Sequence, residues 1–228
     1  IIAIGTLVMV TGGLFTWIEA RTARKAMHAT MMAQALMLAA AFDHEKIAAL
    51  SGTAEDLTSA DYRYLRDQLT RVRDSNPKYR YLYLLGRREG QRPFYFLGTA
   101  PEDSEDHSPP GQVYFEASPT LEQVFASRSP QLSPPFTDRW GTWVSALIPV
   151  VHPQNGALLA VFGIDVDARD WQSKILRRSM MPALITCLII VFMGAGAGFL
   201  RRRHLDAHVA ALRRAETALR ESETLFRL

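Results

Sequence analysis

The sequence predicts an α+β fold: an antiparallel sheet with a long flanking N-terminal helix, placed between two transmembrane helices. The helices follow from two long uncharged runs in the 228 residues, 1–18 and 179–200. Each run is long enough to cross ~30 Å of hydrocarbon at ~1.5 Å per residue. The sheet follows from residues 43–170, which mix charged, aromatic and turn-forming residues as a domain with one core does. A mean hydropathy of −0.04 averages these unlike parts.

The first run, 1–18, fits either a signal peptide or an uncleaved membrane anchor. A signal peptide has a shorter apolar core that ends at a small-residue cleavage site. Here Trp17 stands at the end of the run, where interfacial aromatic residues belong, and charged residues begin at Glu19. We therefore expect a transmembrane helix over 1–20.

The second run ends in Arg201-Arg202-Arg203, and consecutive arginines beside a span mark the cytoplasmic side. Arg177 and Arg178 flank its other end, so the charge contrast is modest. We expect a transmembrane helix over 171–200, with 201–228 in the cytoplasm and about 21–178 outside. The formal net charge of +3 falls entirely within 201–228. The pI of 9.2 therefore does not indicate nucleic-acid binding.

Residues 26–42 are also uncharged, which leaves a third span as an alternative. The segment is rich in Ala and Met rather than Leu, and its larger apolar residues fall on one helical stripe: Met27, Met31, Ala35 beside Gln34, Leu38 and Phe42. We prefer an amphipathic helix that continues out of the membrane, within a juxtamembrane segment over 21–58.

The first half of the outer region predicts a helix and a hairpin. The helix follows a Ser59 cap and breaks at Asn76-Pro77. Aromatic, strand-like runs at 79–86 and 92–99 then form the hairpin. Residues 100–118 are rich in Pro, Asp, Glu, Ser and Gly and predict a long loop.

The second half predicts a short helix and a second hairpin. Ser118-Pro119 places proline at the first helical position. Strands at 142–151 and 157–166 follow, joined by the turn residues His152-Pro153-Gln154-Asn155-Gly156. A helix then leads towards the second apolar run.

The segment WGTWVSALIPVVHPQNGALLAVFGIDVDARDW resembles the end of the PAS-like extracytoplasmic sensor domains called Cache domains. Pro149 matches the proline before the final turn, and Gly163-Ile164-Asp165 matches the Gly-x-Asp of the last strand. YRYLYLLGRR, SPPGQVY and TDRWGTWVSAL are similar to a version common in bacterial hybrid sensor histidine kinases and diguanylate cyclases. The resemblance implies a sensor domain over 59–170. The Tyr, Arg and Trp pattern of amino-acid-binding members is not found, so amino-acid specificity is not implied.

The C-terminal residues 201–228 predict a cytoplasmic, coiled-coil-like linker helix. Val209, Leu212, Leu219 and Phe226 fit heptad core places, although Glu216 and Glu223 interrupt them. RAETALRESETLFRL resembles the lead-in to a cytoplasmic PAS domain. With the Cache resemblance, this implies a multi-pass protein of the bacterial inner (cell) membrane, with 21–178 periplasmic or extracellular.

Ligand-binding candidates come from the last strands and the first hairpin. Asp165 and Asp167 lie two apart on one strand, hence on one face, where two carboxylates suit an amine or a cation. The alternative is a solvated pair at the point where the strand leaves the sheet, which we favour for Asp167. An Arg beside two indoles suits a carboxylate or a flat ring, although core packing explains tryptophans equally well. The full candidate set is Asp165, Arg139, Trp143, Trp140, Tyr83, Tyr95 and Asp167.

Metal and catalytic chemistry find little support. The acidic loop 101–107 lacks the fixed geometry of a Ca²⁺ loop, and we interpret it as solvated. His204 and His208 have ligand spacing but no third ligand nearby. The single Cys187 lies within the second apolar run and excludes an intrachain disulfide. We find no catalytic triad or phosphate-binding glycine loop and expect no catalytic residue, metal or cofactor.

These patterns favour the input module of a signal-transduction receptor, sensing a small molecule outside the membrane. The expected output, in the same chain beyond Leu228, is a sensor histidine kinase. The alternatives are a diguanylate cyclase output, a dimerisation or protein-interaction domain without a small-molecule pocket, and a membrane-anchored hydrolase, for which the catalytic residues are missing. The expected partners are a small-molecule ligand, the lipid bilayer and a second copy of the chain, with no nucleic acid.

Overall fold

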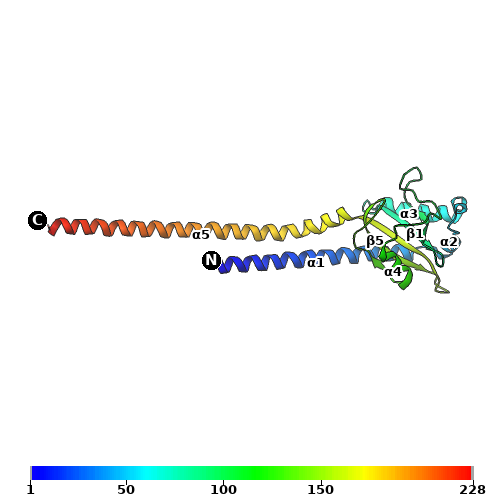
Figure 1. The fold of residues 1–228 in the computed structure, drawn as a ribbon, viewed down its shortest axis with the longest axis horizontal. Coiled ribbons are helices and arrows are strands. Elements are labelled where there is room, and N and C mark those ends of the chain that lie inside the picture. Colours follow the sequence, from blue (N-terminus) through cyan, green and yellow to red (C-terminus); the bar gives the residue numbers. More distant parts are fainter. Residues whose placement is uncertain (1, 227–228) are drawn as a thin grey trace. The chain divides into compact units, whose positions relative to one another are not determined.

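The structure is a computed structural model that describes residues 2–226. The chain divides into two compact units: a domain over Thr22–Leu176, which we call the outer domain after its expected location, and a helical unit of the residues before and after it. The elements in chain order (Figure 1) are α1 Ile2–Ala40, α2 His44–Ala48, η1 Ala54–Thr58, α3 Ala60–Ser75, β1 Tyr81–Arg87, β2 Pro93–Gly98, α4 Pro119–Ser127, β3 Gln131–Leu132, β4 Phe136–Asp138, β5 Gly141–Val151, β6 Leu158–Asp167 and α5 Ala168–Phe226.

The outer domain is built on one antiparallel sheet in the order β2-β1-β6-β5-β3, with β4 also paired to β5. The two predicted hairpins are confirmed as β1–β2 and β5–β6. Because β1 pairs with β6, the hairpins join into one sheet. The α+β class and its antiparallel sheet are thereby confirmed. The strands β3 and β4 were not predicted, since two or three residues carry no readable alternation.

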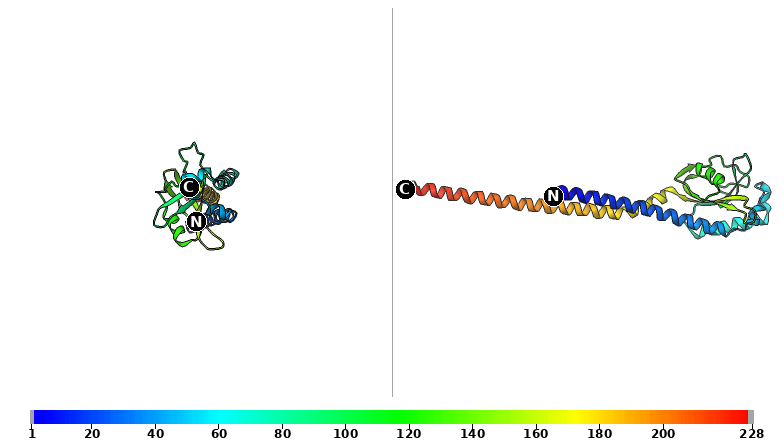
Figure 2. Two further views of the ribbon diagram at one scale, coloured as in Figure 1. Left: turned by 90° about the vertical axis from the view of Figure 1, so that its right-hand side faces the viewer. Right: turned by 90° about the horizontal axis from the view of Figure 1, so that it is seen from below.

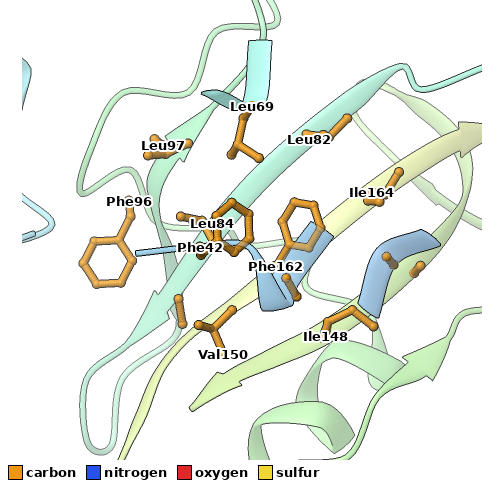
Figure 3. Close-up of a cluster of buried hydrophobic side chains, with 14 of the residues drawn as sticks. Phe42, Leu69, Leu82, Leu84, Phe96, Leu97, Ile148, Val150, Phe162 and Ile164 are labelled. Atoms are coloured by element: carbon orange, nitrogen blue, oxygen red, sulfur yellow. The ribbon is translucent and has the colours of Figure 1, made fainter. Parts of the chain in front are cut away.

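Both faces of the sheet are buried, and side chains alternate between them. The α1, α2 and α3 side holds the larger core, which includes Leu82, Leu84, Ile148, Phe162 and Ile164 (Figure 3). The opposite side, under α4 (Figure 2), holds a smaller and more aromatic cluster: Tyr83, Leu85, Tyr95, Tyr114, Leu121, Val124, Phe125, Leu147 and Val161. Burial on both sides explains why these strands read as nearly continuous apolar runs.

Serine caps begin both predicted helices of the outer domain. The Ser59 hydroxyl accepts the backbone N–H of Asp61 and Tyr62 at the start of α3. The Ser118 hydroxyl accepts the N–H of Leu121 in α4, where Pro119 occupies the first turn. A side-chain oxygen there satisfies donors that the helix itself leaves unpaired.

The segment 26–42 packs onto the sheet. In α1, Met31, Ala35 and Ala39 are buried, and Phe42 follows just after the helix. All four belong to the larger core, with Met27 and Leu38 packed against it. The stripe therefore forms the amphipathic face that we preferred over a third span.

Among the described residues, one helix is long and apolar enough to cross a membrane, within Ala168–Ala215 of α5. Residues 4–18 of the first predicted span are helical in α1, and their membrane role stays a prediction. The heptad residues Val209 and Leu212 are exposed in the single chain. Leu219 and Phe226 fall where side chains are not described, and the PAS-like lead-in extends past the described residues.

We predict that Phe42→Ala lowers the free energy of unfolding by about 3–5 kcal/mol, the usual range for a buried Phe. The Phe42 side chain is 5% exposed and meets the Phe162 ring edge-on at 4.9 Å. Met37→Ala is the control, because Met37 is 74% exposed in the same segment and should change the value by under about 0.5 kcal/mol. Denaturant unfolding of the full chain in detergent measures both. Equal effects would contradict the packing of 26–42 on the sheet.

Candidate ligand-binding cavity

A small cavity opens on the aromatic face of the sheet, between β1, β2, β5 and β6. Its walls also include residues of the loop after β2 and of the β4–β5 turn. The residues that line it are Tyr81, Leu82, Tyr83, Tyr95, Gly98, Thr99, Ala100, Asp106, Ser108, Tyr114, Asp138, Trp140, Trp143 and Asp165. Strand pleating explains the grouping, because side chains two apart on each strand point to one face.

Asp165 is the most buried acid of the cavity. It pairs across the sheet with Tyr81 on β1 and Ser145 on β5, and its side-chain Oδ1 accepts the Tyr83 hydroxyl at 2.9 Å. Burial, helped by the charge of Asp138, raises the pKa of the Asp165 carboxyl to about 7, and hydrogen bonds from Ser145 and Tyr83 limit the rise. Near neutral pH this carboxyl is therefore poised between its acid and carboxylate forms.

Gly163 makes room for the phenol that binds Asp165. Tyr83 pairs with Gly163 across the β1–β6 ladder, and a Cβ at Gly163 would stand 2.1 Å from the Tyr83 ring. A side chain there would push the ring off the sheet. The glycine of the Gly-x-Asp motif thus leaves room for Tyr83, whose hydroxyl donates to the aspartate of the same motif.

Two further carboxylates are held in place from outside the central strands. Asp138 Oδ1 accepts the backbone N–H of Trp140 and Gly141 and the indole N–H of Trp143 at 2.9, 3.1 and 3.0 Å. Its Oδ2 accepts the Tyr114 hydroxyl at 2.9 Å. These four donors satisfy a half-buried carboxylate and fix its orientation.

Asp106 reaches the cavity from the long loop after β2. Its Oδ2 accepts the Tyr81 hydroxyl at 2.5 Å and lies 3.7 Å from an Arg80 nitrogen. The acidic loop 101–107, which we interpreted as solvated, therefore contributes one carboxylate to a protein wall. Across the described residues, no three His, Cys, Asp or Glu side chains are grouped to hold a metal ion.

Aromatic rings form the remaining walls. Tyr81 meets Trp143 edge-on with centroids 5.3 Å apart, and Tyr83 meets Tyr95 at 6.0 Å. Trp140 stands 6.1 Å from Tyr95. Burial raises the pKa of the Tyr83 and Tyr95 phenols well above the usual value, so both stay neutral.

Five of the seven predicted candidates meet in this cavity: Asp165, Trp143, Trp140, Tyr83 and Tyr95. Arg139 and Asp167 are not among its lining residues. The exposed Arg139 guanidinium makes two hydrogen bonds to Glu116, at 2.9 and 2.8 Å, and stacks over Trp140. Asp167 ends its strand, and its carboxylate accepts the N–H of Arg169 and Asp170 at 2.7 and 3.4 Å, as a helix cap does.

Nine lining residues were not among the candidates, and four of these carry a carboxyl group or a phenol: Tyr81, Asp106, Tyr114 and Asp138. Tyr81 follows the same alternation as Tyr83, so the predicted strand held the signal. Tyr114 and Asp138 lie within SPPGQVY and TDRWGTW, which carried the Cache resemblance. Asp106 gave no usable signal, because a long loop has no periodicity to show where it folds back.

No family model and no curated protein sequence matches the chain. Several solved structures resemble it. One is the ligand-binding domain of the Campylobacter jejuni chemoreceptor Tlp3 in complex with 4-methylisoleucine, at a TM-score of 0.49 and 12% identity over 75% of this chain and 62% of that one. A second is the extracellular domain of the putative histidine kinase mmHK1S-Z2, at 0.42 and 16% over 69% and 60%.

A third is methyl-accepting chemotaxis protein X, at a TM-score of 0.40 and 14% identity over 72% of this chain and 66% of that one. This chain thus spans less than two thirds of these matched chains. The similar structures come from chemoreceptors and a putative histidine kinase. At identities of 16% or less and TM-scores below 0.5, they assign no ligand and no residue role to this chain.

We predict that the free energy of unfolding falls by about 2–3 kcal/mol between pH 5 and pH 8 through Asp165 alone. The folded carboxyl keeps its proton up to a pKa of about 7, whereas the unfolded one loses it near pH ~3.9. This stabilisation is complete below the unfolded pKa and is lost as pH rises through the folded pKa.

Asp165→Asn should remove this fall in the free energy of unfolding with pH. Compared with the parent chain, the variant should therefore be more stable at pH 8 than it is at pH 5. Asp103→Asn, an exposed acid of the 101–107 loop, should keep the parent slope. Urea unfolding of the full chain across this pH range measures the difference. Parallel curves for parent and Asp165→Asn would show that the carboxyl titrates at an ordinary pKa.

Proposed function

We propose that this chain is the input module of a bacterial membrane receptor, which binds a small molecule outside the membrane and passes a helix movement to a cytoplasmic output. One observation carries the proposal: the strand that lines the cavity runs directly into the membrane-length helix. Asp165 lies two residues before the end of β6, and α5 begins at Ala168. A ligand that touches Asp165 therefore acts on the same stretch of backbone that leaves the domain.

The start of α5 is fastened to the outer domain, which supports direct coupling. Ala168 and Trp171 are buried in the larger core, and Ile175 packs against it. The Trp171 ring also lies 5.6 Å from the His28 ring of α1. No glycine separates β6 from this turn, so a displacement of β6 is passed on with little backbone slack.

Ligand binding shifts such a receptor only by its different affinity for two arrangements of α5. We propose that the arrangements differ by a small sliding or rotation of α5 within a homodimer, since packed helices move as stiff units. Gly194 and Gly198 form a small-xxx-small pair that suits close helix approach. The 1–18 segment as a second span, the inner-membrane location and the cytoplasmic side of 201–228 belong to the same proposal.

The proposed output is a sensor histidine kinase, in line with the PAS-like lead-in at the C-terminal end. A diguanylate cyclase would use the same input in the same way. A dimerisation domain without a ligand is the other alternative, and the cavity argues against it. Burying a carboxyl group is unfavourable, and a surface that only binds a protein has no need of a cavity lined by the buried Asp165.

The first test is a thermal-shift screen of the full chain in detergent against small metabolites. A compound at 100 times its dissociation constant should add about 2.7 kcal/mol to the free energy of unfolding. With a compound found in this way, and a histidine kinase reporter fused after Leu228, inserting four glycines between Arg169 and Asp170 should abolish switching and leave affinity nearly unchanged.

The matched control inserts four glycines between Asn155 and Gly156, in the β5–β6 turn, where switching should survive. If the variant with glycines between Arg169 and Asp170 still switches, the signal must travel by another route, such as α1. A screen in which nothing stabilises the chain would favour the dimerisation domain.

We also predict that neutralising Arg201, Arg202 and Arg203 together produces a mixed orientation in the membrane. Arg177 and Arg178 would then carry the larger positive charge beside the span, which favours placing the N-terminal end of that span on the cytoplasmic side. A reporter that is active only on one side of the membrane, fused after Leu228, measures the fraction of chains in each orientation. Neutralising Arg177 and Arg178 instead should keep the C-terminus cytoplasmic. A uniform orientation in the triple variant would show that flanking charge does not set the topology.

A further inference from the structure

We infer that a second site, a basic groove between α1 and the edge strand β3, binds the phosphate-bearing headgroup of an anionic membrane lipid. The residues that line this groove are Arg24, Lys25, His28, Ala29, Met32, Pro130, Gln131 and Leu132, and we call it the α1 groove. It shares no lining residue with the cavity beside Asp165. This inference rests on one part of the proposed function, the membrane span over 1–20, and not on the cavity.

Helical spacing brings the basic residues of the α1 groove to one side of α1. Arg24 and His28 are four positions apart, and Lys25 and Met32 are seven apart, so each pair lies on one helix face. Met32 from α1 and Leu132 from β3 are half-buried and pack against the larger core. The two walls of the groove are therefore fixed to the outer domain.

The first observation is positive charge without a counter-charge. No Asp or Glu is among the described residues that line the groove. The ion pairs of the described residues include neither Arg24 nor Lys25. Partial burial and the charge of Arg24 lower the pKa of His28, so the imidazole is neutral at pH 7. An anion bound in the groove would supply the missing negative charge.

Phosphate is the anion that these side chains suit best. A guanidinium such as that of Arg24 donates two parallel hydrogen bonds to phosphate oxygens, and an ammonium such as that of Lys25 adds a mobile point charge. The neutral His28 ring has an N–H that can donate a further hydrogen bond. The three groups together offer donors from one helix face to a single phosphate.

The second observation is the place of the groove along α1. The helix runs without interruption over Ile2–Ala40, and Arg24 and Lys25 follow the proposed span 1–20 by four and five residues. At about 1.5 Å per residue they stand roughly 6–8 Å beyond it, which is about the thickness of one headgroup layer. Helix side chains also point back towards the N-terminus, here towards the membrane. Both cations therefore reach the level of the lipid phosphates.

The third observation is the size and the apolar part of the groove. Its volume is about 600 Å³, against about 30 Å³ for the cavity beside Asp165. Ala29, Met32, Pro130 and Leu132 give it apolar walls next to the cations. A free phosphate would leave those walls in water, whereas the glycerol and first acyl carbons of a lipid would cover them. The combination of cations and apolar walls therefore favours a lipid over a free phosphate.

Charge argues against a second copy of the chain as the occupant. Two copies that met groove to groove would bring the same cations together, because a two-fold interface uses the same patch on both partners. Like charges held close together repel each other. The second copy of the proposed homodimer therefore belongs on another face of the helices.

The α1 groove adjoins the start of α5. The His28 ring, which lines the groove, lies 5.6 Å from the Trp171 ring in the first turn of α5. A lipid headgroup beside His28 would therefore stand one side chain away from the helix that carries the proposed signal. Lipid binding would stabilise the arrangement of α1 and α5 in which this contact is formed.

Native mass spectrometry of the full chain in a neutral detergent tests the site. Phosphatidylglycerol, which is anionic, and phosphatidylcholine, which is zwitterionic, are added with identical acyl chains, and the bound fractions give both dissociation constants. Phosphatidylglycerol should bind at least about tenfold more tightly than phosphatidylcholine. Glycerol phosphate, which has the phosphate without acyl chains, should bind at least about tenfold more weakly than phosphatidylglycerol.

Arg24→Gln combined with Lys25→Gln should weaken phosphatidylglycerol binding about 25-fold, since each cation near an anionic lipid contributes about fivefold. Binding of phosphatidylcholine should stay the same. Exchanging the two residues, Arg24→Lys with Lys25→Arg, keeps both charges and should restore the affinity to within about threefold. Lys174→Gln with Arg177→Gln is the matched control, because it removes two exposed cations of α5 that do not line the groove. It should change the affinity less than about twofold.

Three outcomes would overturn the inference. Equal affinity for the two lipids would remove the anion site, and an equal loss in the α5 control pair would replace the groove by general attraction to basic residues near the membrane. Glycerol phosphate that binds as tightly as phosphatidylglycerol would point to a free phosphate ligand instead. None of these outcomes involves the cavity, so the sensor proposal would stand. A metabolite screen without hits would reject that proposal and leave the lipid result unchanged.

Discussion

A carboxyl group placed in the middle of a sheet that is buried on both faces is the constraint around which the outer domain is arranged. Asp165 is only 6% exposed, so its neighbours supply most of its hydrogen bonds. Tyr83 does so because Gly163 leaves room for its ring, and Ser145 does so from the neighbouring strand. Residues of the loop after β2 and of the β4–β5 turn lie beside this buried carboxyl, and together they form the walls of the cavity.

Much of this architecture could be predicted, because local patterns determine it. The serine caps of α3 and α4 and the two hairpins depend on neighbours within a few positions. The joint placement of Asp165 with Tyr83 needed only strand alternation and one correct pairing. Trp140 and Trp143 could be proposed as wall residues from their position at a strand start, although the sequence left core packing equally open.

The remainder depended on contacts between distant segments. Arg139 and Glu116 are 23 positions apart, so no pattern showed that the guanidinium was already paired. Asp167 shares the alternation of Asp165, but its strand ends there and the carboxylate caps α5 instead. Asp106 comes from a loop with no periodicity, and Asp138 from a strand of three residues. Alternation identifies a face of a sheet but not where that face is covered.

The junction at Asp167 and Ala168 has a further consequence, for how such modules can be exchanged between proteins. Because β6 passes into α5 without a flexible spacer, the sheet fixes the rotational phase of the first turns of the helix, which belong to the same compact unit. One added residue turns the following helix by about 100°, whereas seven restore its facing to within about 20°. In an uninterrupted helix, an insertion of seven residues after this junction therefore keeps the facing of the residues that follow, and an insertion of one residue does not. Lineages that lengthen or shorten the linker are expected to do so in whole heptads.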